Sequence, residues 1–283
     1  MTRRRLFGRR PWALVTKGVS LLAGISLTLT GTPSGASSAP GTVKILAAGS
    51  LSNVLTRLEP AFHAATGDTL QVTLMGSTEL ASGIKAKSLL GDIFLSASLG
   101  ADQALEGSAN GAWISRYSLL GTSPVVLAYR ATSTYAHSLL HRPWYSVITD
   151  PGFVLGRTDP TVDPGGVLDL DALKGIGYAY NEPALLTLAG NSRDIYPESA
   201  LPGLLQAGQL DGAFMYAVSA RAAGLPFVPL VGTKNLAATY TVATLKGAPD
   251  ARAAATFVKW LSSARAKAIL VAQGLALNPR FAG

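Results

Sequence analysis

Two serines stand where hydroxyl groups could hold an anion. Gly49-Ser50 follows the apolar run "VKILAA", and Gly76-Ser77 follows "LQVTLM". Glycine lets a backbone or a ligand approach closely, and a helical pattern begins directly after each pair. Because the start of a helix carries free N–H groups and a partial positive charge, two such corners that converge would bind an oxyanion without Lys or Arg. Alternatively, each serine only caps its helix.

A third candidate is the stretch "GRTDPTVDPGG", residues 156–166. Proline fixes its own φ and restricts the residue before it, so each of the two Asp-Pro pairs predicts a rigid turn. Gly165 and Gly166 would then present bare backbone N–H groups at the start of the next helix. The residues leave two interpretations open, a donor corner for a ligand or an Asx-type turn without a ligand role.

A tyrosine and a serine complete the set of candidates. Tyr216 closes the predicted strand in "GAFMYAVSA" and could present its hydroxyl to a ligand, although a tyrosine at this position is also typical of a protein core. The preceding "PESALPGLL" predicts another helix, with Glu198 and Ser199 near its first turn. Tyr216 and this helix start form the fourth candidate element.

All of these candidates lie at element ends within an alternating pattern. From Val43 onwards, short apolar runs alternate with stretches of helical periodicity, which indicates an α/β fold with mostly parallel sheets. Ligands bind such sheets at the carboxyl ends of the strands. Residues 131–150 interrupt the alternation, and we expect a surface excursion with a short helix there. The predicted strands are "VKILAAG", "LQVTLMG", "DIFLSAS", "PVVLAYR", "FVLGRT", "GAFMYAVS" and "FVPLV".

The composition narrows the function classes. The chain has 283 residues, 48% of them hydrophobic and 14% charged, and no cysteine. A disulfide framework, a thiolate metal site and a Cys nucleophile are therefore excluded. Six of the 24 Lys and Arg residues lie in residues 1–36, which leaves 18 basic against 16 acidic residues in the rest of the chain. That near balance, without a basic cluster, argues against nucleic-acid binding.

The first 36 residues have the pattern of an export signal. A basic segment, "MTRRRLFGRRPW", precedes the short apolar run "VSLLAGISLTLTG" and the small residues "TPSGASSAPG". The stretch "RRLFGR" resembles a twin-arginine signal, and we expect cleavage after Ala36. The alternative is an uncleaved anchor, for which the apolar run is shorter than the roughly 20 residues of a spanning helix. The sequence thus predicts a periplasmic or extracytoplasmic protein.

These motifs, in this order, give the chain a resemblance to a known family. It resembles the substrate-binding proteins of molybdate/tungstate ABC transporters from about Val43 to Phe281. "AAGSLSNVL" and "GSTELA" look like the family's two oxyanion loops. "GRTDPTVDPGG" is similar to the Asp-Pro signature of the tungstate-type branch, and "GAFMYAVSA" to the strand with the pocket tyrosine. The resemblance implies a two-lobed periplasmic-binding-protein fold that closes over one molybdate or tungstate ion and delivers it to an ABC transporter permease.

The resemblance also implies roles for particular residues. Asp163 matches a carboxylate that helps complete a six-coordinate metal centre in some archaeal relatives. Those relatives have a Glu directly before the tyrosine, where this chain has Met215, so a plain tetrahedral oxyanion is expected, with no metal site and no cofactor. Another departure is Ser98-Leu99, where relatives usually carry an Asp. The implied oxyanion-binding residues are Ser50, Ser77, Asp163, Gly165, Ser199 and Tyr216.

The same resemblance divides the mature chain into two lobes. Lobe one would comprise residues 41–123 and 231–283, and lobe two residues 124–230. Each lobe would contain a mostly parallel sheet flanked by helices. The two crossings would lie in "LLGTSPVV" and "PLVGTKN", whose glycines and small polar residues suit hinge strands. We expect such a protein to be a monomer.

Three other functions remain to be weighed. Another oxyanion, such as sulfate or thiosulfate, would use the same donors, and a sensor with the same fold could carry an altered pocket. An enzyme is the least favoured class, because the chain lacks a G-x-S-x-G elbow and a phosphate-binding P-loop. Its three histidines, His63, His137 and His141, fall away from the candidate corners.

Overall fold

A computed structural model describes residues 39–234 and 236–282. The predicted export signal lies outside these residues. The first predicted strands form as expected, because branched apolar residues fill a buried sheet: β1 (Thr42–Ala48), β2 (Thr69–Met75) and β3 (Ile93–Ser96). β1 runs parallel to both β2 and β3, so the carboxyl ends of these three strands lie at one edge. That edge holds both Gly-Ser corners.

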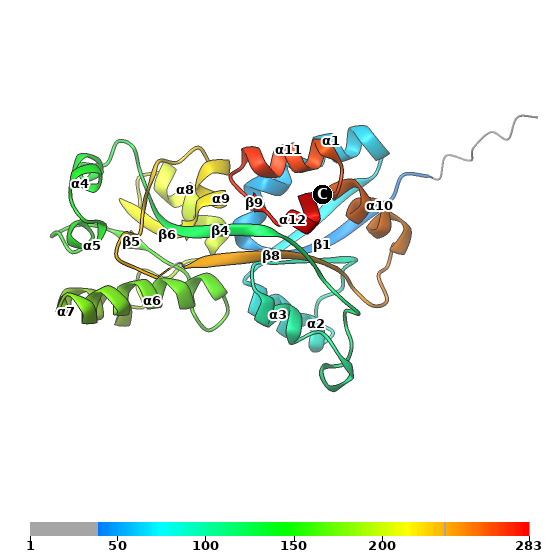
Figure 1. Ribbon diagram of the computed structural model, residues 1–283, viewed down its shortest axis with the longest axis horizontal. Helices are drawn as coiled ribbons and strands as arrows, with labels where there is room; N and C mark the ends of the chain where they lie inside the picture. The colour runs from blue at the N-terminus through cyan, green and yellow to red at the C-terminus, as the bar shows by residue number, and fades with distance from the viewer. Residues whose placement is uncertain (1–38, 235, 283) are drawn as a thin grey trace, which may run out of the picture. The chain divides into compact units, whose positions relative to one another are not determined.

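Two strands make the sheet mixed, and the expectation of mostly parallel sheets needs correction here. β8 (Ala237–Thr244), which the sequence analysis did not predict, pairs antiparallel with β3 and with β4 (Ser118–Tyr129). β4 also begins well before the predicted run "PVVLAYR". The strand order is β2-β1-β3-β8-β4-β6-β5. β4 and β8 lie side by side in Figure 1 and pair in opposite directions, so the middle of the sheet is antiparallel.

β4 changes its partners partway along its length. Ser118–Pro124 pairs with β8, and Val125–Tyr129 pairs antiparallel with β6 (Gly212–Tyr216). Three of the latter residues also pair with β7 (Phe227–Pro229). β5 (Leu155–Gly156) is parallel to β6, whereas β9 (Ala276–Leu277) pairs with the first half of β4. Two groups of strands are therefore joined by one continuous strand.

Helices flank both groups of strands. In the region of β1 to β3 they are α1 (Ser52–Thr66), α2 (Ser77–Lys85), α3 (Leu99–Gln103), α10 (Ala251–Leu261) and α11 (Ala264–Ala272). In the region of β5 and β6 they are α6 (Pro164–Ala179), α7 (Pro183–Gly190), α8 (Leu201–Gln206) and α9 (Ala217–Ala222). The predicted excursion at 131–150 contains α4 (Ala136–His141) and α5 (Trp144–Val147). Short 3-10 helices are η1 (Gly49–Leu51), η2 (Ser108–Asn110) and η3 (Glu198–Ala200), and α12 (Pro279–Ala282) ends the described chain.

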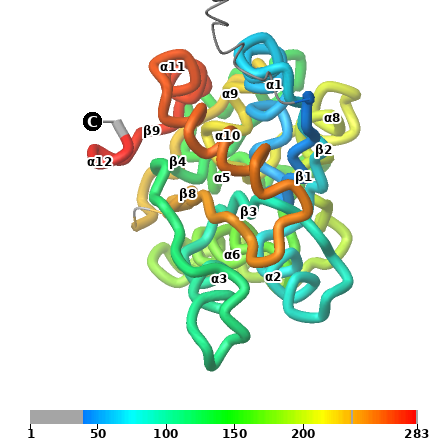
Figure 2. Tube along the Cα trace, turned by 90° about the vertical axis from the view of Figure 1, so that its right-hand side faces the viewer, coloured from blue at the N-terminus to red at the C-terminus, as the bar shows by residue number. Residues whose placement is uncertain are grey.

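The packing of α1 against α10 anchors the corner after β1. Phe62, on the buried face of α1, contacts both Phe257 and Trp260 edge-on, with ring centroids 5.3 Å apart in each case. Aromatic pairs of this geometry add to the stability gained by burying the rings. Figure 2 shows α1, α10 and α11 together beside β1. Among the described residues, no helix is long and apolar enough to cross a membrane.

Candidate functional site

The first corner is built by η1, between β1 and α1. Ser50 is fully buried, and its hydroxyl accepts a hydrogen bond from the Tyr240 hydroxyl at 2.9 Å. No side chain caps α1, so Ser50 is not a helix cap. Ser50 instead lies beside the Glu198 carboxyl, and its hydroxyl and backbone N–H act to lower the pKa of that group. A Cβ atom on Gly49 would lie 3.1 Å from the Ser199 nitrogen, so this glycine permits the close approach of η1 and η3.

The second corner is formed by Gly76 and the first turn of α2. Ser77 is buried, and its hydroxyl oxygen accepts a hydrogen bond from the Ala97 N–H at 3.0 Å, which leaves the hydroxyl hydrogen for another acceptor. A Cβ atom on Gly76 would collide with the Val162 carbonyl and lie 3.0 Å from the Asp163 Cα. The second corner therefore packs directly on the Asp-Pro loop.

The Asp-Pro loop folds as the Asx-type turn that the sequence analysis left open. Asp163 caps α6, and its Oδ1 accepts from the Gly165 N–H at 2.7 Å. Asp159 accepts from the Thr161 N–H at 2.8 Å and from its hydroxyl at 2.7 Å. The Gly165 N–H is thus already engaged by a carboxylate, which differs from the bare donor that the sequence suggested.

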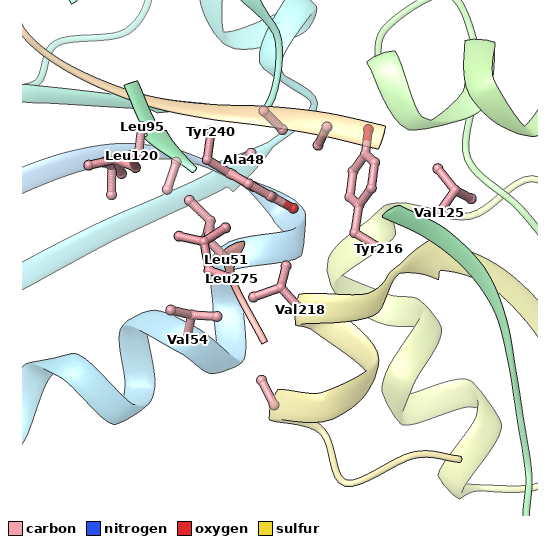
Figure 3. Close-up of a cluster of buried hydrophobic side chains, with 14 of the residues drawn as sticks. Ala48, Leu51, Val54, Leu95, Leu120, Val125, Tyr216, Val218, Tyr240 and Leu275 are labelled. Carbon is pink, nitrogen blue, oxygen red and sulfur yellow. The ribbon is translucent and has the colours of Figure 1, made fainter. Parts of the chain in front are cut away.

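Two tyrosines face each other between the corners. Tyr216, at the end of β6, and Tyr240, on β8, have ring centroids 5.9 Å apart, and Figure 3 shows Tyr240 reaching towards Ala48 at the end of β1 with Tyr216 across from it. The Tyr216 hydroxyl is buried without a hydrogen-bond partner among the described residues. A Cβ atom on Gly165 would lie 3.5 Å from that hydroxyl. Burial raises the pKa of both phenols well above their usual value, so both remain protonated donors at neutral pH.

Glu198 is the functional candidate that the sequence analysis noticed without assigning it to the site. Its side chain is only 5% exposed, and its Oε1 has no hydrogen-bond partner among the described residues. Burial, followed by the neighbouring Asp163 and Asp169 carboxyls, raises its pKa well above the usual value. The available signal was its position at the first turn of a helix in "PESAL", directly before Ser199.

A cavity of about 410 Å³ opens between these elements. It is lined by Gly49 and Gly76 from the first two corners, by Asp163 from the Asp-Pro loop, and by Glu198 and Ser199 from η3. A narrow space beside it, with no room for a water-sized sphere, shares its Thr158 and Glu198 walls and is also lined by Gly165 and Tyr216. Ser50 adjoins Glu198, and Ser77 follows Gly76. The structure thus brings all six predicted residues to one region.

The cavity is lined by carboxyl groups rather than by cations. Glu79, Asp159, Asp163 and Glu198 line it, and none of its lining residues is Lys or Arg. Burial raises the pKa of Asp163 to about 6, against the lowering effect of the Gly165 N–H. Met215, directly before Tyr216, packs in an apolar cluster with residues such as Leu205. Within the described residues, no group of three or more His, Asp or Glu side chains could hold a metal ion.

Asp169 lies beneath the site and gives a prediction about stability. Its carboxyl accepts from the Thr158 N–H at 3.1 Å, and burial raises its pKa to about 8, far above that of an unfolded aspartate. Its contribution to stability is therefore complete below about pH 4 and is lost as the pH rises to about 8. We expect Asp169→Asn to raise the free energy of unfolding at about pH 8 by at least about 1 kcal/mol, because the amide is never charged.

Urea unfolding at about pH 5 and about pH 8 measures this effect. Asp171→Asn, on the exposed side of the same helix, is the matched control and should change neither value. If Asp169→Asn and the wild type have the same free energy of unfolding at the higher pH, ionisation of Asp169 does not destabilise the folded protein.

Comparison with known proteins gives consistent results. The profile of the family described as bacterial extracellular solute-binding proteins matches residues 43–276. The chain is 32% identical over 197 residues to a Haloferax volcanii protein named as an ABC transporter molybdenum-binding protein, covering 69% of this chain and 61% of that protein. It is 25% identical over 204 residues to a molybdate/tungstate-binding protein of Pyrococcus abyssi, covering 54% and 59%. The chain thus spans about three fifths of the length of the curated relatives it matches.

Solved structures show the same fold. The periplasmic molybdate-binding protein of Azotobacter vinelandii superposes with a TM-score of 0.63 at 17% identity, covering 83% of this chain and 99% of that one. The sulfate-binding protein SubI of Mycobacterium tuberculosis also gives 0.63, at 14% identity and with 86% and 89% covered. The mixed α/β fold is therefore the two-lobed fold of periplasmic binding proteins, as the sequence predicted.

Proposed function

This chain belongs to the bacterial extracellular solute-binding proteins, and we propose that it captures a tetrahedral oxyanion, molybdate or tungstate, between its lobes. The observation that carries the proposal is the convergence of the two Gly-Ser corners and the η3 turn on one cavity, with Tyr216 in the narrow space beside it. Support also comes from the named molybdate- and tungstate-binding relatives. The protein would be exported, act as a monomer and pass its cargo to an ABC transporter permease.

The proposed binding mechanism uses uncharged donors. A dianion that leaves water must be hydrogen-bonded at every oxygen, since an unpaired buried charge is very costly. Ser50 and Ser77 would supply hydroxyl and backbone donors, Ser199 a backbone N–H, and Tyr216 its unpartnered hydroxyl. In the structure the Gly165 N–H is engaged by Asp163, so Gly165 would contribute by leaving space beside Tyr216.

The lobes proposed to close on the ion are residues 41–123 with 231–283, and residues 124–230. The change of partners within β4 at Pro124 and Val125 supports the first boundary. The contact of Gly76 with the Asp-Pro loop would then be made across the cleft, as would the contact of Gly49 with Ser199. Closure of this kind, with hinges in a few residues of connecting strands, is common in two-lobed binders.

Thermal unfolding with a panel of oxyanions tests the proposal. Molybdate or tungstate at about 100 times its Kd should stabilise the native state by about 2.7 kcal/mol, since a ligand that binds only the folded protein shifts the equilibrium. Sulfate and thiosulfate are the competing ligands, and isothermal titration calorimetry ranks all four. A separate assay with esterase substrates tests for catalysis. The family's role in binding gives no reason to expect turnover.

The double variant Ser50→Ala/Ser77→Ala should lose the stabilisation, because both hydroxyls are removed. Ser82→Ala, exposed on the same helix as Ser77, is the matched control and should respond like the wild type. The absence of any stabilisation by the four oxyanions would contradict the proposal and favour a sensor with an altered pocket.

A further inference from the structure

The Glu198 carboxyl is the buried polar group that the site leaves incompletely paired. It sits at the start of η3, which packs against η1, and Ser50 lies beside it. Within the described part of the chain, neither its Oε1 nor the Tyr216 hydroxyl has a hydrogen-bond partner. Both groups line the same narrow space next to the cavity. Two unpaired buried polar groups in one space indicate a ligand that pairs with both, because such groups are costly when left alone.

The charges around Glu198 are of one sign. Of the elements packed on η3, the residues of η1, β2 and α8 include no charged side chain. The titratable groups that face it from other elements are Asp163, Asp169, Tyr216 and Tyr240. Glu79 and Asp159 line the same cavity, and the Arg157 guanidinium is paired with Asp194 at 3.2 Å.

An ionised Glu198 would therefore repel the proposed ligand. In a water-excluded site the repulsion between a carboxylate and a dianion is far larger than in water. A neutral carboxylic acid removes the repulsion and adds an O–H donor where the structure has an unpaired oxygen.

Building on the proposed function, we propose that Glu198 carries a proton in the loaded protein and donates a hydrogen bond from Oε1 to an oxygen of the bound oxyanion. The upward pKa shift from burial agrees with this assignment. The proton comes from solvent whenever Glu198 is ionised in the free protein, and no other bond is made or broken. Together with Tyr216, Glu198 would form a pair of neutral O–H donors on one side of the ion.

Calorimetric titration of molybdate from about pH 6 to about pH 10 tests this role. Molybdate is a dianion over this range, so any change in affinity belongs to the protein. The wild type should keep full affinity below the pKa of Glu198 and lose about tenfold per pH unit above it. Glu198→Gln, whose amide is neutral and keeps a donor, should bind within about threefold of the wild type at neutral pH and show no such decline.

An infrared difference spectrum gives a direct readout. On addition of molybdate, the C=O stretch of a protonated carboxylic acid should appear or shift in the wild type, and that band should be missing from Glu198→Gln. Glu59→Gln, at an exposed position on α1 away from the cavity, is the matched control and should keep both the band and the pH profile.

Several results would overturn the inference while leaving the proposed function intact. One is tight binding by the wild type together with a loss of about 100-fold or more in Glu198→Gln, which would mean that the ionised carboxylate holds the ligand. Another is a profile flattened by Asp163→Asn but not by Glu198→Gln, which would assign the proton to Asp163. If the wild type binds no oxyanion, the proposed function itself fails.

Discussion

Gly76→Ala is expected to weaken molybdate binding by about 5- to 150-fold, the equivalent of the about 1–3 kcal/mol that overpacking costs. The added methyl group would meet the Val162 carbonyl and lie 2.8 Å from its carbon. These are backbone atoms, so no side chain can rotate away. The φ of Gly76 is −62°, a value open to any residue, so the effect is steric contact with the Asp-Pro loop rather than strain within Gly76.

Gly175→Ala supplies the control for this experiment. Gly175 lies within α6 and is exposed, and a Cβ atom there would meet nothing within 4 Å. That variant adds the same methyl group and should bind like the wild type, with a small gain in stability from helix propensity. Calorimetric titration compares the two variants. Unchanged affinity in Gly76→Ala would show that the ligand does not require the corner and the loop to pack together.

Arg157→Ala is expected to lower the free energy of unfolding by about 3–5 kcal/mol, the usual result of breaking a buried ion pair. Arg157 is 2% exposed, and its guanidinium contacts Asp194 and the carbonyl of Asn191. Burial raises the pKa of Asp194 even with this arginine beside it. Removal of the arginine would leave a buried carboxyl that must either protonate or draw in water.

The same substitution leaves the main-chain hydrogen bonds of residue 157 in place. The backbone of Arg157 pairs with Asp194 at 2.8 Å and with Tyr196 at 2.9 Å, and this tie joins the Asp-Pro loop to the segment that leads into Glu198. Urea unfolding measures the stability, and Arg142→Ala is the control, since its pair with Asp150 is exposed and its loss should have little measurable effect. If Arg157→Ala has nearly the wild-type free energy of unfolding, the Arg157–Asp194 ion pair does not stabilise the protein.

The sequence predicted the corners well because their chemistry is local. A glycine and a serine between a buried strand and a helical pattern can be recognised from neighbouring residues alone, and the Asp-Pro turns follow from the geometry of proline. The same local reasoning left the role of Gly165 undecided. Whether its N–H meets a ligand or Asp163 depends on one side-chain rotamer, which no pattern of residue types determines.

Other features depended on contacts between distant segments. β8 was missed because "AATYTVAT" is built of small and polar residues, and its burial comes from β3 and β4, more than 100 residues earlier in the chain. Glu198 was not assigned to the site because its significance is its burial against η1, about 150 residues away. The antiparallel direction of β4 and β8 likewise depends on topology rather than on composition.

Pro124 has a mechanical consequence. It lies inside β4, at the residue where the strand leaves β8 for β6 and β7, so its missing N–H falls at a change of partners. The strand runs on without a break, and Val125 N–H bonds to the Leu236 carbonyl at 2.8 Å. A load applied to one group of strands is thus transmitted to the other through main-chain bonds. Any rotation of one group of strands relative to the other must therefore bend this continuous strand, which resists bending more than a flexible linker would.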